Sequence, residues 1–327
     1  MYEMAVILEE LSRGGNPGGL LIGLTAIFGG LGIQEHGTDE QKEIYLTRIS
    51  DGDMQFCMGL TEPNAGVNLT QIETFAKQDG DEYVINGQKV YISGADHADA
   101  MLLITRTEEY DPDNPTQGIT LFLVDEPSER NSIEMNPIEL EVPWFETQYQ
   151  IHFNDLRVSE DDILGLRDQG LYQLWDTLNT ERIATAAGNV GTGLRAIDLG
   201  VEQANQRKVF EEPIGSHQSI QHPLAESYAE LKAARNMTYE AAWKFDNGEE
   251  CGEESNICKL LASNAAEDAA SNAMQAHGGG GFAPENEVFP LWVNSRLFQT
   301  VPIPNELVKN FLAEHSLGLP KSYKSGF

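Results

Sequence analysis

The stretch Leu178-Asn179-Thr180-Glu181-Arg182-Ile183 opens a long run of the chain that is rich in alanine and glycine. Apolar residues recur at helical spacing through this run, which predicts one helix over about residues 171–207. The helix carries an acidic side chain, Glu181, through a mostly apolar region. A carboxylate in such a place is either a paired structural group or a general base whose pKa is raised by loss of water.

The region that follows predicts three more helices, over about residues 219–247, 253–277 and 305–315. Alanine and glycine on facing sides of long helices allow the backbones to approach closely, as in an antiparallel bundle. Pro223 is expected to disturb the second of the four helices, because proline removes a backbone hydrogen bond. We therefore expect a C-terminal four-helix bundle.

The middle of the chain, from about Cys57 to Val158, has the alternating pattern of strands. Asn86-Gly87 predicts a tight hairpin between strands at 83–85 and 89–93. Further strands are expected at 101–105, 119–124, 151–153 and 156–158. Short strands with close turns predict a central antiparallel β-barrel or sandwich. Since no Gly-x-Gly-x-x-Gly follows a strand, the pattern argues against a Rossmann dinucleotide site.

The chain from Tyr2 to about Ile49 is predicted to be helical, with an interruption at residues 14–19. Thr38 to Gln41 has the pattern of an N-terminal cap before a helix that ends near Ser50. The first helix begins at once, which suggests a shortened N-terminal helical domain. The expected fold is α+β and multidomain, with a partial N-terminal helical domain at 1–56, the β domain at 57–162 and the bundle at 163–327.

The charge balance limits the classes of partner. Lys+Arg number 21 against 52 Asp+Glu, and the formal net charge of −31 disfavours nucleic acid and anionic membranes as partners. Acid spread along the chain with few lysines is typical of a halophilic protein. The three cysteines have no metal-ligand spacing, so no metal is expected, and their sparse, odd count indicates a reducing compartment. No stretch is long and apolar enough to span a membrane, and we expect a cytoplasmic protein.

Five segments together resemble the acyl-CoA dehydrogenase family. Met58 to Gly66 (MGLTEPNAG) resembles the loop of that family that contacts the flavin, and Lys89 to Ser93 (KVYIS) resembles its second flavin segment. Arg207 to Phe210, His217-Gln218 and Gln275 to Phe282 (QAHGGGGF) match further family segments in the same order. The resemblance implies a helical, β and helical order of domains, with non-covalent FAD between the β domain and the bundle.

The resemblance also assigns residues to the cofactor. The flavin ring would be contacted by Met58, Leu60 and Thr61, with Tyr91 packed on it and the Ser93 hydroxyl near its N5 edge. The remaining FAD contacts would come from Arg207, Phe210, Gln218, Gln275, Gly278 and Gly279, the last three from a neighbouring subunit. Glycine suits this role because a backbone without Cβ can approach phosphate closely. Sharing FAD across subunits implies a homodimer or homotetramer.

The chemistry implied by the resemblance is α,β-dehydrogenation of an acyl-CoA thioester to trans-2-enoyl-CoA. A carboxylate removes the α proton while a hydride leaves the β carbon for flavin N5, and an electron-transferring flavoprotein takes the electrons. In much of the family the base lies near the C-terminus, but Pro302 occupies that position here. In the branch that includes isovaleryl-type and some long-chain enzymes, the base lies on the first bundle helix, directly before an arginine.

Glu181, followed by Arg182, matches that second arrangement and is the predicted catalytic base. Glu306 is a weaker rival, and an exposed ion pair of Glu181 with Arg182 is the structural alternative. Asn179 and Arg182 are expected to lie near the substrate, as is Val67, which replaces the usual serine of the family. Two other functions remain open: an oxidase that passes electrons to oxygen, and a flavin-binding protein with impaired turnover.

Overall fold

A computed structural model describes residues 1–15, 22–143 and 146–322 of the 327-residue chain. Packing divides these residues into two compact units. The first unit contains the described residues of Met1–Gly19, Val142–Phe145 and Asn179–Ser322, and it is helical apart from one short hairpin. The second unit contains the remaining described residues and holds the sheet.

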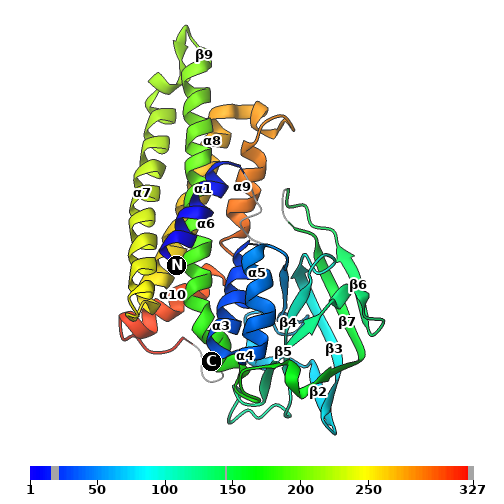
Figure 1. The fold of residues 1–327 in the computed structure, drawn as a ribbon. Helices are drawn as coiled ribbons and strands as arrows, with labels where there is room; N and C mark the ends of the chain where they lie inside the picture. The colour runs from blue at the N-terminus through cyan, green and yellow to red at the C-terminus, as the bar shows by residue number, and fades with distance from the viewer. Residues whose placement is uncertain (16–21, 144–145, 323–327) are drawn as a thin grey trace. The chain divides into compact units, whose positions relative to one another are not determined.

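Three long helices dominate the helical unit: α6 (Gly170–Gln206), α7 (Gln218–Asp246) and α8 (Gly252–His277). The part of α6 from Asn179 onward belongs to this unit. They run side by side, and α7 and α8 are in extensive contact (Figure 1). Small residues allow this approach, since a Cβ at Gly193 would come within 2.5 Å of the Leu231 side chain. The predicted bundle of closely packed helices is confirmed, and each of these three helices begins and ends within one residue of its expected bounds. Pro223 lies in the second turn of α7 and does not end it.

Two shorter helices complete the C-terminal part. α10 (Asn305–Phe311) continues as a π-helical turn, Leu312–Ser316, and this confirms the helix expected at 305–315. α9 (Val288–Leu297) was not predicted, because Pro290 near its start and the preceding glycines resemble a loop. It is held on α8 by a hydrogen bond from Trp292 Nε1 to Ser271 Oγ at 3.0 Å.

The N-terminal helix α1 (Tyr2–Arg13) belongs to the helical unit. Glu9 on α1 is 2 % exposed and accepts hydrogen bonds from Arg235 Nε at 2.7 Å and from Tyr239 Oη at 2.9 Å. The backbone of α1 also passes closely over α6, because a Cβ added at Gly191 would lie 2.1 Å from the carbonyl oxygen of Glu9. A buried ion pair and a glycine contact therefore dock this helix.

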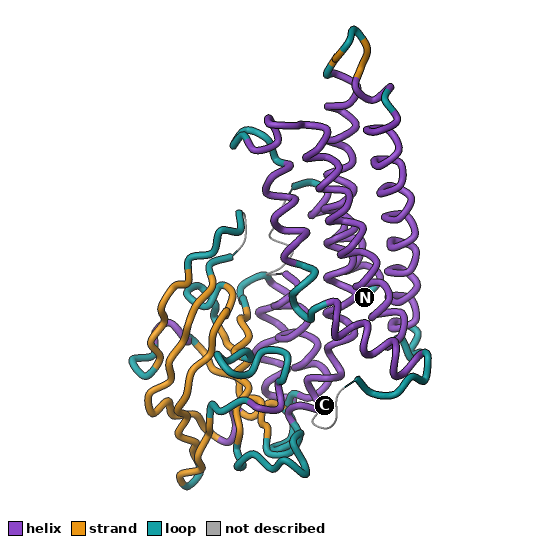
Figure 2. Tube along the Cα trace, turned by 180° about the vertical axis from the view of Figure 1, so that it is seen from behind, coloured by secondary structure: helices purple, strands orange, loops and turns teal. Residues whose placement is uncertain are grey.

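The second unit is built on an eight-stranded sheet, which forms most of the orange trace in Figure 2. The strand order is β6-β7-β3-β2-β4-β5-β8, with β1 beside β4. The expected sheet is confirmed, but it is mixed, because β1 and β2 both pair parallel with β4. The strands are β1 (Phe56–Gly59), β2 (Phe75–Asp79), β3 (Glu82–Ser93), β4 (Ala100–Arg106), β5 (Ile119–Asp125), β6 (Ile133–Ile138), β7 (Gln148–Ser159) and β8 (Ile163–Leu164).

The hairpin predicted at Asn86-Gly87 is wrong. β3 continues through both residues, and the chain reverses earlier, between β2 and β3. Asn86 instead exchanges hydrogen bonds with Asp155 on β7, each at 3.0 Å, where the register of the two strands shifts. Gly87 is required there because its φ is +148° and a Cβ would lie 2.6 Å from Thr74. The Asn-Gly signal here marks an irregularity within a strand pair, not a turn.

Helical segments precede the sheet in the second unit. They are a π-helical run at Leu24–Leu31, α3 (Gly32–His36), α4 (Asp39–Gln41), a π-helical turn at Lys42–Leu46 and α5 (Thr47–Asp51). The cap predicted at Thr38 is confirmed as a capping box, with Gln41 N donating to Thr38 Oγ1 at 3.1 Å. Tyr45 then donates from its hydroxyl to Asp125 on β5 at 2.8 Å and ties these helices to the sheet.

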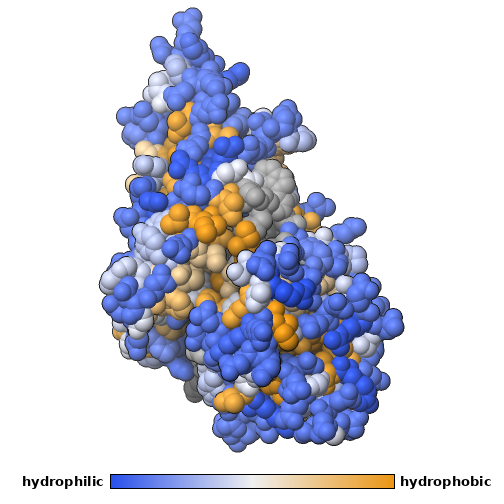
Figure 3. Space-filling model, viewed as in Figure 1, coloured by the Kyte–Doolittle hydropathy of each residue, from blue (hydrophilic) through white to orange (hydrophobic). Residues whose placement is uncertain are grey.

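The face of the molecule shown in Figure 3 is mostly hydrophilic. Among the residues that the structure describes, none of the helices combines the length and the apolar character that crossing a membrane requires.

The docking of α1 gives a stability prediction. We expect Gly191→Ala to lower the free energy of unfolding by about 1–3 kcal/mol, because the new methyl overlaps the α1 backbone. Gly188→Ala is the matched control, since its Cβ would meet only Ser12 Oγ at an ordinary 3.5 Å. That control should be neutral or stabilising by up to about 1 kcal/mol through helix propensity. Denaturant unfolding of both variants is the measurement, and equal stability of the two would contradict the proposed close contact.

Candidate functional site

The two segments predicted to contact the flavin ring lie together in the second unit. Lys89 on β3 donates from Nζ to the carbonyl oxygen of Leu60 at 3.0 Å, and Val90 N donates to Thr61 O at 2.8 Å. Leu60 and Thr61 follow β1 directly. The structure therefore brings the residues around 58–61 beside those around 89–93, although they are distant in sequence.

A buried ion pair fixes this loop. Lys89 is fully buried, and its Nζ lies 2.7 Å from Oε1 of Glu62, which is 5 % exposed. Burial lowers the pKa of Lys89 to about 8. Burial alone would raise the pKa of Glu62, but Lys89, the backbone N–H of Glu73 and hydrogen bonding by Thr74 outweigh it and leave this pKa lowered. Removing one partner of such a pair costs about 3–5 kcal/mol, so the loop is rigid.

Tyr91 and Ser93 continue the same strand. Tyr91 lies at a register shift between β3 and β7, with φ of 58° and 57 % of its surface exposed. A bulky residue with positive φ is an outlier that surrounding structure must hold in place. The Ser93 hydroxyl is fixed by Gln148, whose Nε2 donates to it at 2.9 Å. Val67, expected near the substrate, is half exposed, and Met58 is partly buried.

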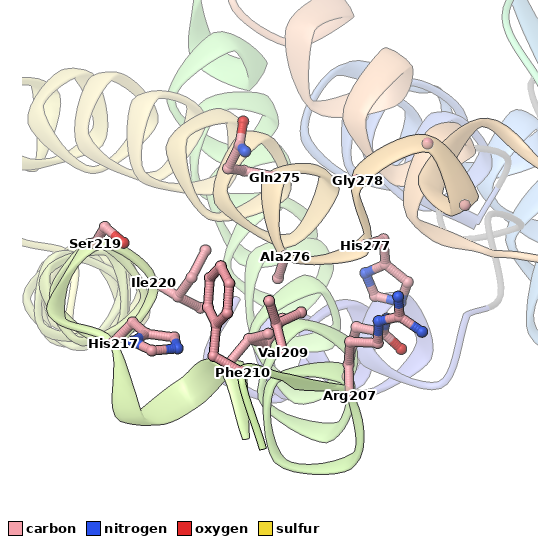
Figure 4. A pocket seen from close by; sticks show the side chains of 14 residues that line it. Arg207, Val209, Phe210, His217, Ser219, Ile220, Gln275, Ala276, His277 and Gly278 are labelled. Atoms are coloured by element: carbon pink, nitrogen blue, oxygen red, sulfur yellow. The ribbon is translucent and has the colours of Figure 1, made fainter. Parts of the chain in front are cut away.

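The helical unit contains an open pocket of about 820 Å³. Five of the predicted cofactor residues line it: Arg207, Phe210, Gln275, Gly278 and Gly279. Gln218, predicted with them, does not line this pocket. Ile220 and His277 do line it and were not among the predicted contacts, although His277 stands inside the Gly-rich segment. Figure 4 shows Arg207 and His277 on one side of the pocket, with Phe210 and Ile220 on the other.

A short hairpin supplies one wall of this pocket. β9 (Lys208–Val209) and β10 (Glu212–Pro213) are joined by Phe210 and Glu211, whose φ angles are 53° and 71°. Two successive positive φ values are typical of a type I′ turn, which strongly prefers asparagine and glycine. A phenylalanine in this position, with 89 % of its surface exposed, is not explained by packing within the unit. We interpret it as a contact for a flat ligand.

The residues of the pocket fit the anionic half of FAD. Arg207 makes no ion pair within the described chain, although acids outnumber bases by 52 to 21. Gly278, Gly279 and Gly280 have only open space or distant atoms where a Cβ would stand, so their backbone can meet a ligand. His277 is oriented by donation from Nδ1 to Ala273 O at 2.9 Å. A free guanidinium beside exposed backbone is a site for phosphate, and Phe210 adds an aromatic surface.

Glu181 lies on α6 in the helical unit and is partly buried. Burial raises the pKa of its carboxyl to about 7, and the positive charges of Arg182 and Lys259 partly offset that increase. No donor among the described residues hydrogen-bonds to it. This combination of burial, nearby cations and free oxygens is what a general base requires.

The alternative of a surface ion pair is not supported. Arg182 is turned to Asn179, donating from Nη1 to Oδ1 at 3.2 Å, and no ion pair joins it to Glu181 within the described chain. Its Nε is buried and has no acceptor among the described residues. The rival base Glu306 is 77 % exposed and lies 3.6 Å from Lys309, so it lacks the desolvation that the chemistry needs.

Comparison with known proteins agrees with this geometry. The chain matches the acyl-CoA dehydrogenase N-terminal domain at 1–53, the middle domain at 57–156 and the C-terminal domain at 168–317. It is 39 % identical over 325 residues to acyl-CoA dehydrogenase FadE12 of Mycobacterium tuberculosis (strain ATCC 25618 / H37Rv), covering 99 % of this chain and 82 % of the relative.

Two solved structures are similar over nearly the whole chain. The acyl-CoA dehydrogenase from Geobacillus kaustophilus has a TM-score of 0.91 and 28 % identity, covering 97 % of this chain and 82 % of that one. The FAD complex of PigA has a TM-score of 0.89 and 25 % identity, with coverage of 97 % and 82 %. Since all three family domains occur in order, the chain belongs to the acyl-CoA dehydrogenase family of FAD-dependent oxidoreductases.

Proposed function

We propose that the protein catalyses α,β-dehydrogenation of an acyl-CoA thioester, with Glu181 as the base that removes the α proton. The observation that carries this proposal is the state of Glu181: partly buried, without a hydrogen-bond donor among the described residues, and with a pKa raised to about 7. A stronger base has a higher pKa, and removal of a thioester α proton needs a base stronger than an exposed carboxylate. With this pKa, the active, unprotonated form of Glu181 is populated near neutral pH.

The proposed cofactor contacts form two groups of residues, one for the diphosphate and adenine and one for the flavin ring. FAD, when bound, accepts the hydride that leaves the substrate β carbon. Arg207 and the backbone of Gly278 and Gly279, which line one pocket of a single chain, would bind its diphosphate together, and Phe210 would contact the adenine. The two glycines would therefore come from the same subunit as Arg207, not from its neighbour. In the second unit, Tyr91 and the Leu60–Thr61 backbone would hold the flavin ring, supported by the Glu62–Lys89 ion pair.

The finer assignments follow from resemblance and are part of the same proposal. Asn179 and Arg182 would contact the acyl-CoA arm, and Val67 would line its path. Because Pro302 occupies the common base position, we place the protein with the branch whose base lies on the first bundle helix. An electron-transferring flavoprotein would accept the electrons, and the protein would act as a homodimer or homotetramer.

The base assignment gives the first functional prediction. Glu181→Gln should retain FAD but lose flavin reduction by acyl-CoA by at least about a hundredfold, because the amide cannot accept the proton. The measurement is anaerobic bleaching of the flavin absorbance by short, branched and long acyl-CoAs. Glu306→Gln is the matched control and should reduce at the parent rate. Reduction of Glu181→Gln at the parent rate would show that the base is elsewhere, and oxygen uptake with bleaching would indicate an oxidase.

The same assay predicts a pH dependence. Glu181 works only when unprotonated, so the rate of flavin reduction should rise with pH and level off above about pH 7, where its pKa lies. Stopped-flow measurements from pH 5.5 to 9 would show this acid limb. A rate that falls with rising pH through this window would contradict a carboxylate base with this pKa.

The cofactor assignment is tested at Arg207. Arg207→Gln should lose FAD on gel filtration, because Arg207 is the only arginine or lysine among the described residues that line this pocket. Lys232→Gln is the matched control, since it removes one exposed positive charge from α7 outside the pocket. Flavin-to-protein ratios after filtration give the result. Equal ratios for the two variants would count against a role of Arg207 in binding FAD.

A further inference from the structure

Lys259 on α8 is a fully buried lysine in the helical unit. Its Nζ donates to Ile303 O at 2.6 Å and to Asn305 Oδ1 at 2.7 Å. Burial lowers its pKa to about 8, with Glu306 and Glu181 acting in the opposite direction and Arg182 adding to the decrease. Near neutral pH the side chain therefore still carries its charge, but it is held by neutral oxygens only.

The partners of Lys259 form a buried polar cluster between α8 and the start of α10. Asn305 is 3 % exposed, and its Nδ2 donates to Ser263 Oγ and to Asn264 Oδ1, each at 3.0 Å. The cluster thus fixes the segment that contains Pro302 and Ile303 against α8. No carboxylate in the described chain forms an ion pair with Lys259. Buried lysines are normally paired, since an unpaired buried charge is costly, and holding a turn does not itself require a charge.

The same face of α8 lies against the part of α6 that carries the proposed base. Ser255, one turn before Lys259, donates from Oγ to Asn179 Oδ1 at 3.0 Å. Arg182 on α6 and Lys259 on α8 are the two charged groups that act on Glu181, and both lower its pKa. Cys258, the neighbouring titratable group, is neutral because burial raises its pKa to about 12. Glu306 acts on Lys259 from α10 but is itself exposed.

We propose that Lys259 is a positioning residue of the active site, which holds the 301–305 segment and supplies a buried positive charge that favours the ionised form of Glu181. The proposal rests on the proposed role of Glu181 as base. Pro302 in that segment can act as neither an acid nor a base, so the segment held by Lys259 offers no proton acceptor at this position, while the charge of Lys259 acts on Glu181 of α6.

The test is the pH dependence of anaerobic flavin reduction in the FAD-loaded protein. Lys259→Gln keeps an N–H donor for the Ile303 carbonyl but removes the positive charge. The acid limb of the pH–rate profile, over which flavin reduction rises with pH, should therefore move to higher pH by about one unit. At pH 7 the rate should fall about fivefold, and at pH 9 it should change little. Lys259→Arg, which keeps the charge, should leave the limb within about 0.3 unit of the parent. Lys232→Gln controls for the loss of an exposed charge and should not move it.

A second variant keeps the lysine in place. Asn305→Asp offers the ammonium a carboxylate partner, which should neutralise it and move the limb in the same direction as Lys259→Gln. The proposal is overturned if the pH range over which flavin reduction rises is the same as in the parent protein in both Lys259→Gln and Asn305→Asp. A lysine with only a structural role would change stability or rate without moving that pH range. If Glu181→Gln still reduces flavin, the base assignment itself fails. If Glu181→Gln loses flavin reduction but the pH–rate profiles of Lys259→Gln and Asn305→Asp do not shift, only the role of Lys259 is refuted.

Discussion

Desolvation of charged side chains between closely packed helices is the constraint on which the helical unit depends. Glycines such as Gly193 let α6, α7 and α8 approach until no space remains for a Cβ. Water is then displaced from the segment that contains Glu181, and the charge of its carboxylate becomes costly. Arg182 and Lys259 reduce that cost without pairing directly with it. The result is a carboxyl group that is neither firmly ionised nor permanently protonated near neutral pH.

The sheet unit uses the same physics for a different purpose. Lys89 is as deeply buried as Lys259, but it meets a carboxylate, that of Glu62, at 2.7 Å. The pair is complete, and backbone donors satisfy the remaining carboxylate oxygen positions. Such a pair holds a loop rigidly and has little tendency to change its charge. Lys259, whose hydrogen bonds within the described chain go only to neutral oxygens, leaves its positive charge available to act on other groups.

Two aromatic side chains stand on strained backbone in otherwise regular surroundings. Tyr91 and Phe210 have φ angles of 58° and 53°, and both are mostly exposed. Neither position is favourable for a bulky residue, and burial does not compensate either one. Strain of this kind is concentrated where a ligand or partner is bound. Both residues stand in segments that we propose to bind FAD, and a bound ligand would give the strain a physical reason.

Sequence alone determined the long helices, the sheet region and the family, because these depend on periodicity, composition and ordered motifs that are local in the chain. It also predicted five of the residues that line the pocket. It failed at α9 and at Asn86-Gly87, where packing on α8 and pairing with β7 override local signals. Only the tertiary structure decided that Glu181 is desolvated and that Lys259 acts on it, since a pKa depends on charges and water brought near by folding.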